Sequence, residues 1–289
     1  MTSRQLTIRR FKCFENFCLR LENLTVLTGR NGVGKSTITQ AIRLMREAAI
    51  SQSPTEIHLN SAGFLLGTFG EILSGSSGDS ASDVFEVGLI DGDECEMFSF
   101  APAEDVDECE YVVATTSGKN TFFSSETPWH FTYLSADREG PRLHQDRTDG
   151  HRSSKVGVGC KGEYSAEVLS NNETTRIDDR LRHKDLVSDS GDSNRLLKSN
   201  LEKWMSTIIG DIGIRAYRPP RLSAPYIEFL LPGRASEWQF PTNHGFGISY
   251  TLPIVLAGLT LEEGGVLIID TPEAHLHPCL LYTSDAADE

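Results

Sequence analysis

The sequence contains no long apolar run. No stretch approaches the roughly 18 residues that a membrane-spanning helix needs, and no apolar signal segment opens the chain. Heptads long enough for a coiled-coil arm are missing, as is any internal repeat. We therefore expect a globular protein with no membrane partner.

Paired cysteine motifs are missing as well. Six cysteines are scattered along the chain without C-x-x-C spacing. This pattern argues against a zinc site and favours free thiols in a reducing compartment. We therefore expect a cytoplasmic protein.

Positive charge is scarce. The chain has 27 Lys and Arg residues against 41 Asp and Glu residues, which gives a net charge of −14. A protein that wraps nucleic acid usually presents a basic stripe, so this balance opposes nonspecific binding to DNA. A local basic groove on a dimer would still allow it. DNA stays an open partner without support from the net charge.

Length and composition set the fold class only broadly. The 289 residues suffice for one large α/β domain or two small ones. A content of 38% hydrophobic and 24% charged residues is typical of a globular protein.

The most specific motif is a glycine-rich loop whose letters, GRNGVGKS, match G-x-x-x-x-G-K-[S/T] at every fixed position. Glycines let the backbone bend around a phosphate and aim N–H groups inward. Lys35 would supply a positive charge for the β- and γ-phosphates, and the Ser36 hydroxyl can hold Mg²⁺. An ordinary surface turn is the competing interpretation. We predict that ATP phosphates are bound by Gly29, Arg30, Asn31, Gly32, Val33, Gly34, Lys35, Ser36 and Thr37.

The segments beside this loop suit a strand–loop–helix unit. An apolar run over 24–28 predicts a buried strand, and apolar residues at helical spacing predict a helix that ends near Ile50. Alternation predicts two earlier strands, over 4–10 and 16–22.

Further elements are predicted along the rest of the chain. Glycine-rich 63–73 should be a loop near the nucleotide, and polar 143–194 a surface excursion with helical pieces. A helix is predicted over 196–209, with Gly210 at its end. Strands are predicted over 84–90, 96–100 and 111–116, which should be antiparallel, and over 130–136, 227–231 and 266–269.

A carboxylate follows the last of these strands. In an open α/β sheet, a side chain at the carboxyl end of a buried strand lies at the ligand crevice. We therefore predict that Asp270 holds Mg²⁺ together with Ser36. A helix cap is the plainer interpretation of this aspartate.

A second candidate anion site lies in the segment 245–249. Ser249 suits a helix N-cap, and Pro253 would then fall in the first turn of the helix. One domain needs only one such site for one triphosphate. We therefore expect Gly247 and Ser249 to face the nucleotide of another subunit.

Five segments taken in order carry a family resemblance: FKCFENF, GRNGVGKST, YLSADREGPR, GFGISYTLPIVLAGL and LIIDTPEAHLHP. Over residues 1–278 the chain resembles the AAA/ABC-like bacterial ATPases related to the ATPase part of OLD-type (overcoming lysogenization defect) nucleases. It is more distantly similar to the SMC and RecF-type DNA-repair ATPases. The resemblance implies a P-loop NTPase of the α/β class, with an ABC-like mixed sheet, an antiparallel β subdomain and a helical lobe formed by a polar insertion over 143–240.

The resemblance also implies how such a protein works. ATP would lie between the two protomers of a nucleotide-dependent homodimer, with the segment 245–249 touching the γ-phosphate of the partner's ATP. Binding and hydrolysis of ATP would drive a conformational change. Several members of the group belong to phage-defence systems and work with a nuclease, so that role and a nuclease partner are implied as well.

Two departures matter. The Leu-Ser-Gly-Gly-Gln signature of transporters is absent, which argues against an ABC transporter subunit. Where ABC enzymes carry the glutamate that activates water, this chain has Thr271, which cannot act as a general base at neutral pH. Glu273 could substitute, or hydrolysis is slow. His275 and His277 could contact the γ-phosphate, bind a metal or serve a structural role.

The last residues, 279–289, fall outside the pattern. CLLYTSDAADE looks like a translated sequencing adaptor joined to a gene fragment, with a genuine acidic tail as the alternative. We therefore expect the natural protein to continue beyond Pro278, and the sheet of this chain to expose apolar surface that the missing part would cover.

These observations predict an ATPase whose catalytic residues are Lys35, Asp270 and Glu273 and whose cofactors are ATP and Mg²⁺. Two alternatives stay open. One is a DNA-repair ATPase whose 143–195 excursion contacts DNA, and the other is a nucleotide-gated interaction module with little turnover. A metabolite kinase shares the glycine-rich loop but should lack the segment 245–249 and would need an acceptor pocket.

Overall fold

The computed structural model divides into two compact units, Met1–Glu126 and Thr127–Glu289. It describes residues 4–50, 54–61, 64–75, 83–104, 108–118, 130–148, 156–187, 191–219, 224–232 and 237–276. None of the helices in these ranges is both long and apolar enough to cross a membrane.

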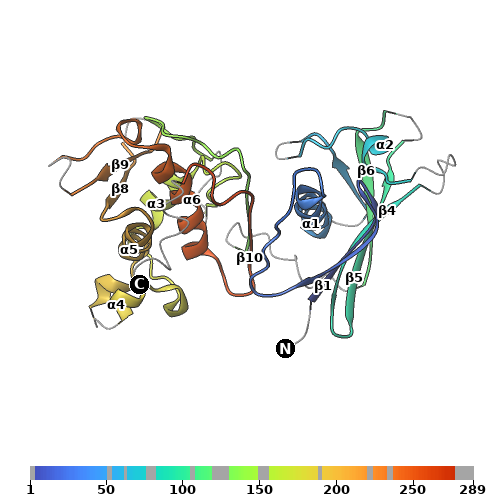
Figure 1. Ribbon diagram of the computed structural model, residues 1–289, viewed down its shortest axis with the longest axis horizontal. Helices are drawn as coiled ribbons and strands as arrows, with labels where there is room; N and C mark the ends of the chain where they lie inside the picture. The colour runs from blue at the N-terminus through green and yellow to red at the C-terminus, as the bar shows by residue number, and fades with distance from the viewer. Residues whose placement is uncertain are drawn as a thin grey trace. The chain divides into compact units, whose positions relative to one another are not determined.

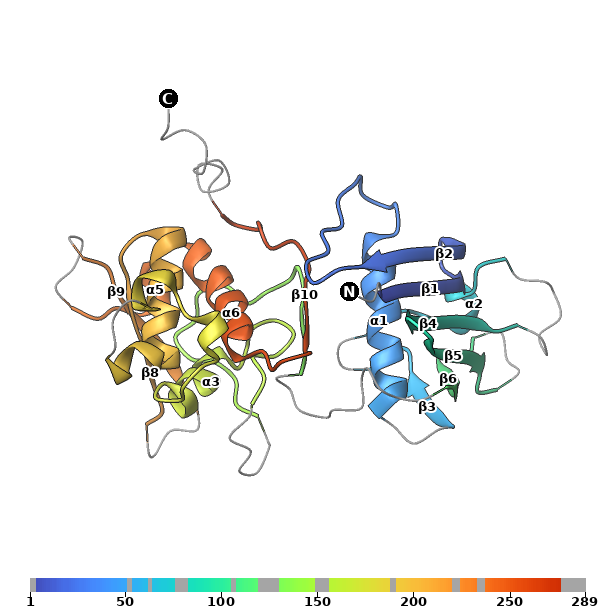
Figure 2. The ribbon, with the colours of Figure 1, turned by 90° about the horizontal axis from the view of Figure 1, so that it is seen from below.

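The first unit is built on a six-stranded antiparallel sheet with the order β2-β1-β4-β5-β6-β3 (Figure 2). The strands are β1 (Arg4–Phe11), β2 (Phe14–Leu21), β3 (Thr55–His58), β4 (Phe85–Asp91), β5 (Glu94–Pro102) and β6 (Tyr111–Ser117). The predicted antiparallel strands are therefore confirmed. Strand β3 falls in a stretch that the sequence had not marked as a strand.

Helix α1 (Lys35–Ile50) covers one face of this sheet (Figure 1). Its apolar side chains recur at helical spacing, and Ala41, Leu44 and Met45 have no exposed surface. They meet a sheet face that carries Phe85 and Phe100, whose rings stack at 4.7 Å. Burial of these side chains anchors the helix, and it thereby fixes the position of the loop that precedes it.

The predicted strand over 24–28 is wrong. This segment forms no strand, and Leu24 and Val26 are 82% and 71% exposed. The Thr25 hydroxyl accepts a hydrogen bond from the backbone N–H of Glu22 and donates one to its carbonyl. Such local bonds compete with strand pairing. An apolar run forms a strand only where a neighbouring strand pairs with its backbone groups. The described residues of this unit supply no such strand beside 24–28.

The segment predicted as a loop near the nucleotide contains the short helix α2 (Phe69–Ile72). Phe69 and Ile72 are buried, and the ring of Phe69 stacks on that of Phe85 at 6.0 Å. The segment thus packs into the core of the first unit. Its first residue, Gly63, lies outside the described residues.

The second unit combines helices with two small sheets. Strands β7 (Phe131–Leu134) and β10 (Val266–Ile269) pair in parallel, and β8 (Gly213–Tyr217) and β9 (Tyr226–Leu230) form an antiparallel pair. The main helices are α3 (Ser165–Asn172), α5 (Leu197–Ile209) and α6 (Phe246–Thr260). Shorter pieces are η2 (Asp179–Leu181), α4 (Lys184–Val187), η3 (Asp192–Arg195) and η4 (Pro241–Asn243).

Helices α5 and α6 pack together in the core of this unit (Figure 1). Leu201 and Met205 of α5 and Leu256 of α6 are fully buried. Glu202 of α5 accepts a hydrogen bond from the backbone N–H of Ile214 at 2.8 Å, and burial raises its pKa. The prediction of α5 and of Gly210 at its end is confirmed, and Gly210 takes the positive φ of 88° that favours glycine.

The predicted start of α6 is wrong by several residues. The helix begins at Phe246 with Gly245 as its N-cap, so Ser249 lies inside the first turns and is no cap. Pro253 is in the helix interior and not in the first turn. Its ring replaces the N–H that would have bonded the carbonyl of Ser249. The α/β fold class is confirmed in this broad form, with an antiparallel sheet, a parallel strand pair and helices.

Candidate functional site

The glycine-rich loop leads directly into the N-terminus of α1. Gly29, Gly32 and Gly34 have φ values of 150°, 80° and 98°, which side chains on L-residues rarely tolerate. A Cβ on Gly34 would lie 2.6 Å from the ring of Phe14 and 2.7 Å from the sulfur of Cys13. Glycine is therefore needed there both for the backbone conformation and for the close packing of the β1–β2 turn.

The Lys35 side chain folds back over this loop. Its Nζ donates hydrogen bonds to the carbonyls of Gly29 and Arg30, both at 2.7 Å. The ammonium is thus held inside the curve of the backbone. An anion that enters the loop would meet this charge directly, and phosphate oxygens could replace the two carbonyls as its partners.

The first turn of α1 supplies backbone donors. The first hydrogen bond within this helix runs from the N–H of Ile38 to the carbonyl of Gly34 at 3.1 Å. The backbone N–H groups of Lys35, Ser36 and Thr37 have no acceptor within the helix, because the helix has no turn before them. The positive end of the helix dipole points the same way. Ser36 is exposed at this end, while Thr37 is buried and its hydroxyl accepts a hydrogen bond from the Cys13 thiol.

In the second unit, Asp270 directly follows β10, as predicted. Its backbone N–H donates to the carbonyl of Leu134 at 2.8 Å, which continues the parallel pairing with β7. Its Oδ1 accepts a hydrogen bond from the Thr271 hydroxyl at 3.1 Å, and the residue is half-buried. A partly exposed carboxylate with a hydroxyl beside it offers the oxygen ligands that Mg²⁺ prefers.

Residues 271–276 form a tight turn after this aspartate. The N–H of Ala274 bonds the carbonyl of Thr271, and that of Leu276 bonds the carbonyl of Glu273. Thr271 and His275 have positive φ values of 49° and 63°. For a β-branched residue this is a strained conformation that costs about 1–3 kcal/mol. Glu273 is exposed on the same turn.

A buried arginine donates hydrogen bonds to the backbone of this turn. Arg138 is 2% exposed, and its guanidinium donates to the carbonyls of Asp270 and Thr271, both at 2.7 Å. It also donates to the carbonyl of Ser135 at 2.9 Å. Burial lowers the pKa of Arg138, although the nearby Tyr250, Asp270 and Glu273 act in the opposite direction. The guanidinium remains a cation at neutral pH. Sequence reasoning gave this arginine no role, although a charged residue just after an apolar strand was the available signal.

The start of α6 packs on the same turn. The ring of His275 lies 4.1 Å from that of Tyr250 and stacks on that of Phe246 at 5.7 Å. A Cβ on Gly247 would lie 3.2 Å from the carbonyl oxygen of His275. The His275 ring thus packs against the first turns of α6, and a contact with the γ-phosphate or a metal stays a prediction. The structure thus brings Gly247 into the neighbourhood of the turn that follows Asp270.

The predicted site residues belong to different units. The glycine-rich loop and Ser36 lie in the first unit, and Asp270, Glu273, Gly247 and Ser249 lie in the second. A metal ion shared by Ser36 and Asp270 stays a prediction. In the part of the chain that the structure describes, no cluster of three or more His, Cys, Asp or Glu residues could hold a metal by itself. His277 lies outside that part.

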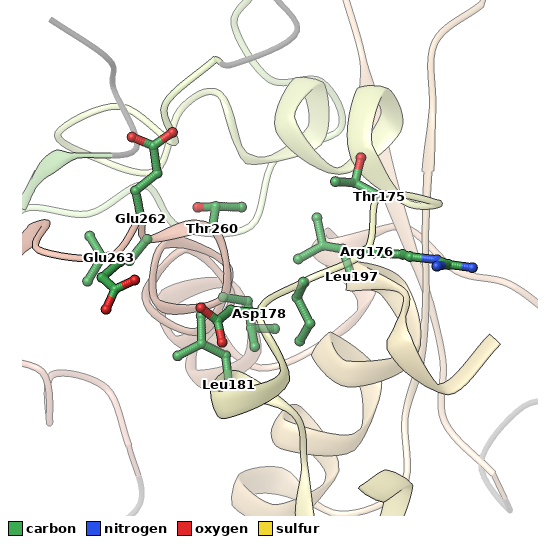
Figure 3. Close-up of a pocket in the computed structure, with 11 residues that line it drawn as sticks. Thr175, Arg176, Asp178, Leu181, Leu197, Thr260, Glu262 and Glu263 are labelled. Carbon is green, nitrogen blue, oxygen red and sulfur yellow. The ribbon is translucent and has the colours of Figure 1, made fainter. Parts of the chain in front are cut away.

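A cavity of about 230 Å³ lies elsewhere in the second unit (Figure 3). In the close-up, Glu262 and Glu263 line one side, at the end of α6. Arg180 bonds both Asp178 and Glu263, and its hydrogen bonds lower the pKa of Asp178 to about 2. The described residues that line this cavity include none of the predicted site residues. Carboxylates at its rim disfavour phosphate groups.

Residues 1–112 match the family model described as AAA ATPase domain. The match covers less than half of the chain, from β1 to the start of β6, and it includes the whole glycine-rich loop and α1. It supports an AAA-type ATPase that binds ATP. No curated protein matches the chain. The AAA ATPase match contains Lys35 and Ser36 but ends before Asp270, so it bears on the loop and not on the acidic strand end.

Four of the cysteines that the structure describes are free thiols: Cys13, Cys18, Cys95 and Cys109. This agrees with the expectation from their scattered spacing. Cytoplasmic localisation stays a prediction.

Proposed function

We propose that this chain is an ATPase that binds Mg²⁺–ATP through its glycine-rich loop. The observation that carries the proposal is the Lys35 ammonium, held within the loop by two backbone carbonyls at the start of α1. The AAA ATPase match over residues 1–112 supports it independently. Mg²⁺, when bound, would neutralise charge on the β- and γ-phosphates.

The residues of the chain have separate roles in this proposal. The loop amides, from Gly29 to Ser36, and Lys35 bind and orient the phosphates, and the Ser36 hydroxyl contributes a metal ligand. Asp270 offers the second oxygen ligand. Positioning and charge stabilisation then supply most of the catalysis, because phosphoryl transfer needs little covalent help from a protein.

The direct test is ATP binding by the intact chain and by its Lys35→Ala variant, measured by isothermal titration calorimetry. We expect the variant to lose at least about tenfold in affinity, since it removes a charge-assisted contact of about 1.5–3 kcal/mol. Lys203→Ala is the matched control, because Lys203 is exposed on α5 in the other unit. Equal affinities for all three proteins would contradict the proposal.

We further propose that the working form is a homodimer assembled on ATP. The support is the resemblance of the segment 245–249 to a signature that faces the partner's nucleotide, together with the packing of Gly247 beside the turn after Asp270. The same resemblance motivates a role in phage defence with a nuclease partner. Steep salt-dependent stimulation of ATP hydrolysis by DNA would instead favour the DNA-repair alternative.

A second candidate function is a nucleotide-gated interaction module with little turnover. One observation favours it. The Thr271 hydroxyl donates a hydrogen bond to the Asp270 carboxylate, and Thr271 has no group that could activate water. The exposed Glu273 carboxylate lies two residues further along the turn and is the remaining candidate base.

A further inference from the structure

We propose that Arg138 is a positioning residue for the metal ligand Asp270. Its guanidinium holds the Asp270–Thr271 peptide in a strained conformation that presents the carboxylate at the end of β10. This inference rests on the proposed function, because it assigns Asp270 to Mg²⁺.

Arg138 bonds backbone carbonyls at the ends of two strands. One guanidinium nitrogen of Arg138 bonds the carbonyls of Ser135 and Asp270, and another bonds that of Thr271. Ser135 follows β7, and Asp270 follows β10. The side chain therefore ties together the carboxyl ends of two parallel strands, which is the edge where ligands bind in open α/β sheets.

The buried guanidinium of Arg138 bonds only backbone carbonyls among the described hydrogen bonds. Arg138 is 2% exposed, and within the described residues its Nε has no hydrogen-bond partner. A buried cation with an unsatisfied N–H is costly, and a plain packing role would be met by an apolar side chain. The planar fork instead suits two neighbouring carbonyls, which a lysine could not bond in the same way.

The backbone of Thr271 is strained. A β-branched residue at φ 49° persists only where its surroundings hold it. The carbonyl of this residue is one of the three that Arg138 bonds. Without the guanidinium, the peptide can relax to negative φ, and the direction of the Asp270 carboxylate changes with it.

Arg138 also lies against α6. The guanidinium carbon of Arg138 lies 5.6 Å from the centroid of the Tyr250 ring, and that ring lies 4.1 Å from His275. The arginine thus contacts both the strand end and the helix that carries Gly247 and Ser249. In the proposed dimer, the N-terminal end of α6 faces the partner's nucleotide. A change at that end of the helix would reach Asp270 through this contact.

The test compares ATP binding in EDTA with binding in saturating Mg²⁺, on the full chain and on Arg138→Met. The ratio of the two dissociation constants measures the gain from the metal. We expect Arg138→Met to bind ATP in EDTA as the unaltered chain does, but to lose about 10-fold to 100-fold of the gain from Mg²⁺, as partners of metal ligands typically do. Arg138→Lys should lose as much, because it keeps the charge but not the fork.

Rescue separates positioning from simple packing. Glycine adopts φ 49° without strain, so adding Thr271→Gly to Arg138→Met should recover much of the lost Mg²⁺ gain. The control is Arg176→Met, which removes an exposed arginine of the same unit whose partner is the exposed Asp192. It should change neither measurement.

The outcomes are distinct. If the unaltered chain does not bind ATP, or if Asp270→Asn keeps the full gain from Mg²⁺, the proposed function fails. If Asp270→Asn loses the gain but Arg138→Met keeps it, the inference on Arg138 alone is overturned. If Arg138→Met does not fold, folding of its double variant with Thr271→Gly supports the inference, and failure of that variant to fold overturns it.

Discussion

At the scale of single residues, Thr271 governs the rate of the ATP hydrolysis that we propose. Thr271 occupies the position after Asp270, and its hydroxyl donates a hydrogen bond to that carboxylate. A neutral hydroxyl is too weak a base to take a proton from water. The strained backbone at Thr271 shows that the turn holds this residue in one orientation. Thr271 therefore cannot supply the base for hydrolysis, which leaves Glu273 as the candidate base on this turn.

Thr271→Glu tests this reading of the turn. A carboxylate at this position should raise ATP turnover at least about tenfold, because a positioned general base typically contributes about 10²–10⁴-fold. Steady-state phosphate release is the measurement. Thr271→Gln is the matched control, since it adds the same bulk without a base and should give no gain. No difference between Glu and Gln would leave Glu273 as the catalytic base and contradict slow hydrolysis for want of a base at this position.

At the scale of elements, the glycine-rich loop is held by its neighbours. The β1–β2 turn packs Cys13 and Phe14 against Gly34, and the Lys12 ammonium bonds Gln40 of α1 at 2.9 Å. Apolar burial on the sheet holds α1 itself. The loop therefore has a preformed curve at the start of a fixed helix, which lowers the ordering cost of binding a phosphate chain.

Two alanine substitutions in this loop separate strain from packing. Gly34→Ala adds a Cβ within 2.7 Å of two side chains at a φ of 98°, so we expect it to lower the free energy of unfolding by about 3 kcal/mol. Gly32→Ala meets no atom within 4 Å at a φ of 80° and should cost only about 1 kcal/mol. Urea unfolding without nucleotide gives both values. Equal losses would show that backbone strain alone accounts for the glycines.

For the whole molecule, charge and assembly oppose each other. Each copy carries a net charge of −14, so two copies repel one another at low ionic strength. A dimer that forms on ATP must overcome this repulsion through the contacts around the nucleotide. Salt should therefore favour the dimer, which is the opposite of its effect on binding to DNA.

Light scattering with and without Mg²⁺–ATP tests this assembly. We expect the mass to double with nucleotide, and more completely as the salt concentration rises from about 0.05 M to 0.3 M. Lys35→Ala should lose both ATP binding and the dimer. Ser249→Arg should bind ATP but stay monomeric, since it places a bulky cation in the segment expected at the interface. A Ser249→Arg protein that still doubles in mass would exclude this segment from the interface.

Local patterns determined a large part of this protein. The spacing of glycines and Lys35 predicted the loop, and alternation and helical periodicity predicted α1, α5 and the antiparallel strands, because these features depend on neighbours in the chain. The position of Asp270 after an aliphatic strand was predicted for the same reason. Strand β3 has only one apolar residue, Ile57, and so carried no pattern. The start of α6 was misplaced because serine suits an N-cap but Gly245 took that position.

Only the tertiary structure decided the rest. The apolar run over 24–28 is exposed in the described structure, because a strand needs a partner for its backbone groups and composition cannot supply one. Arg138 acquired its contacts to Asp270 and Thr271 across more than 130 positions of the chain. The His275 ring came to pack on the rings of Phe246 and Tyr250 in α6. Such contacts join residues far apart in sequence, and they exist only once the strands and helices have packed.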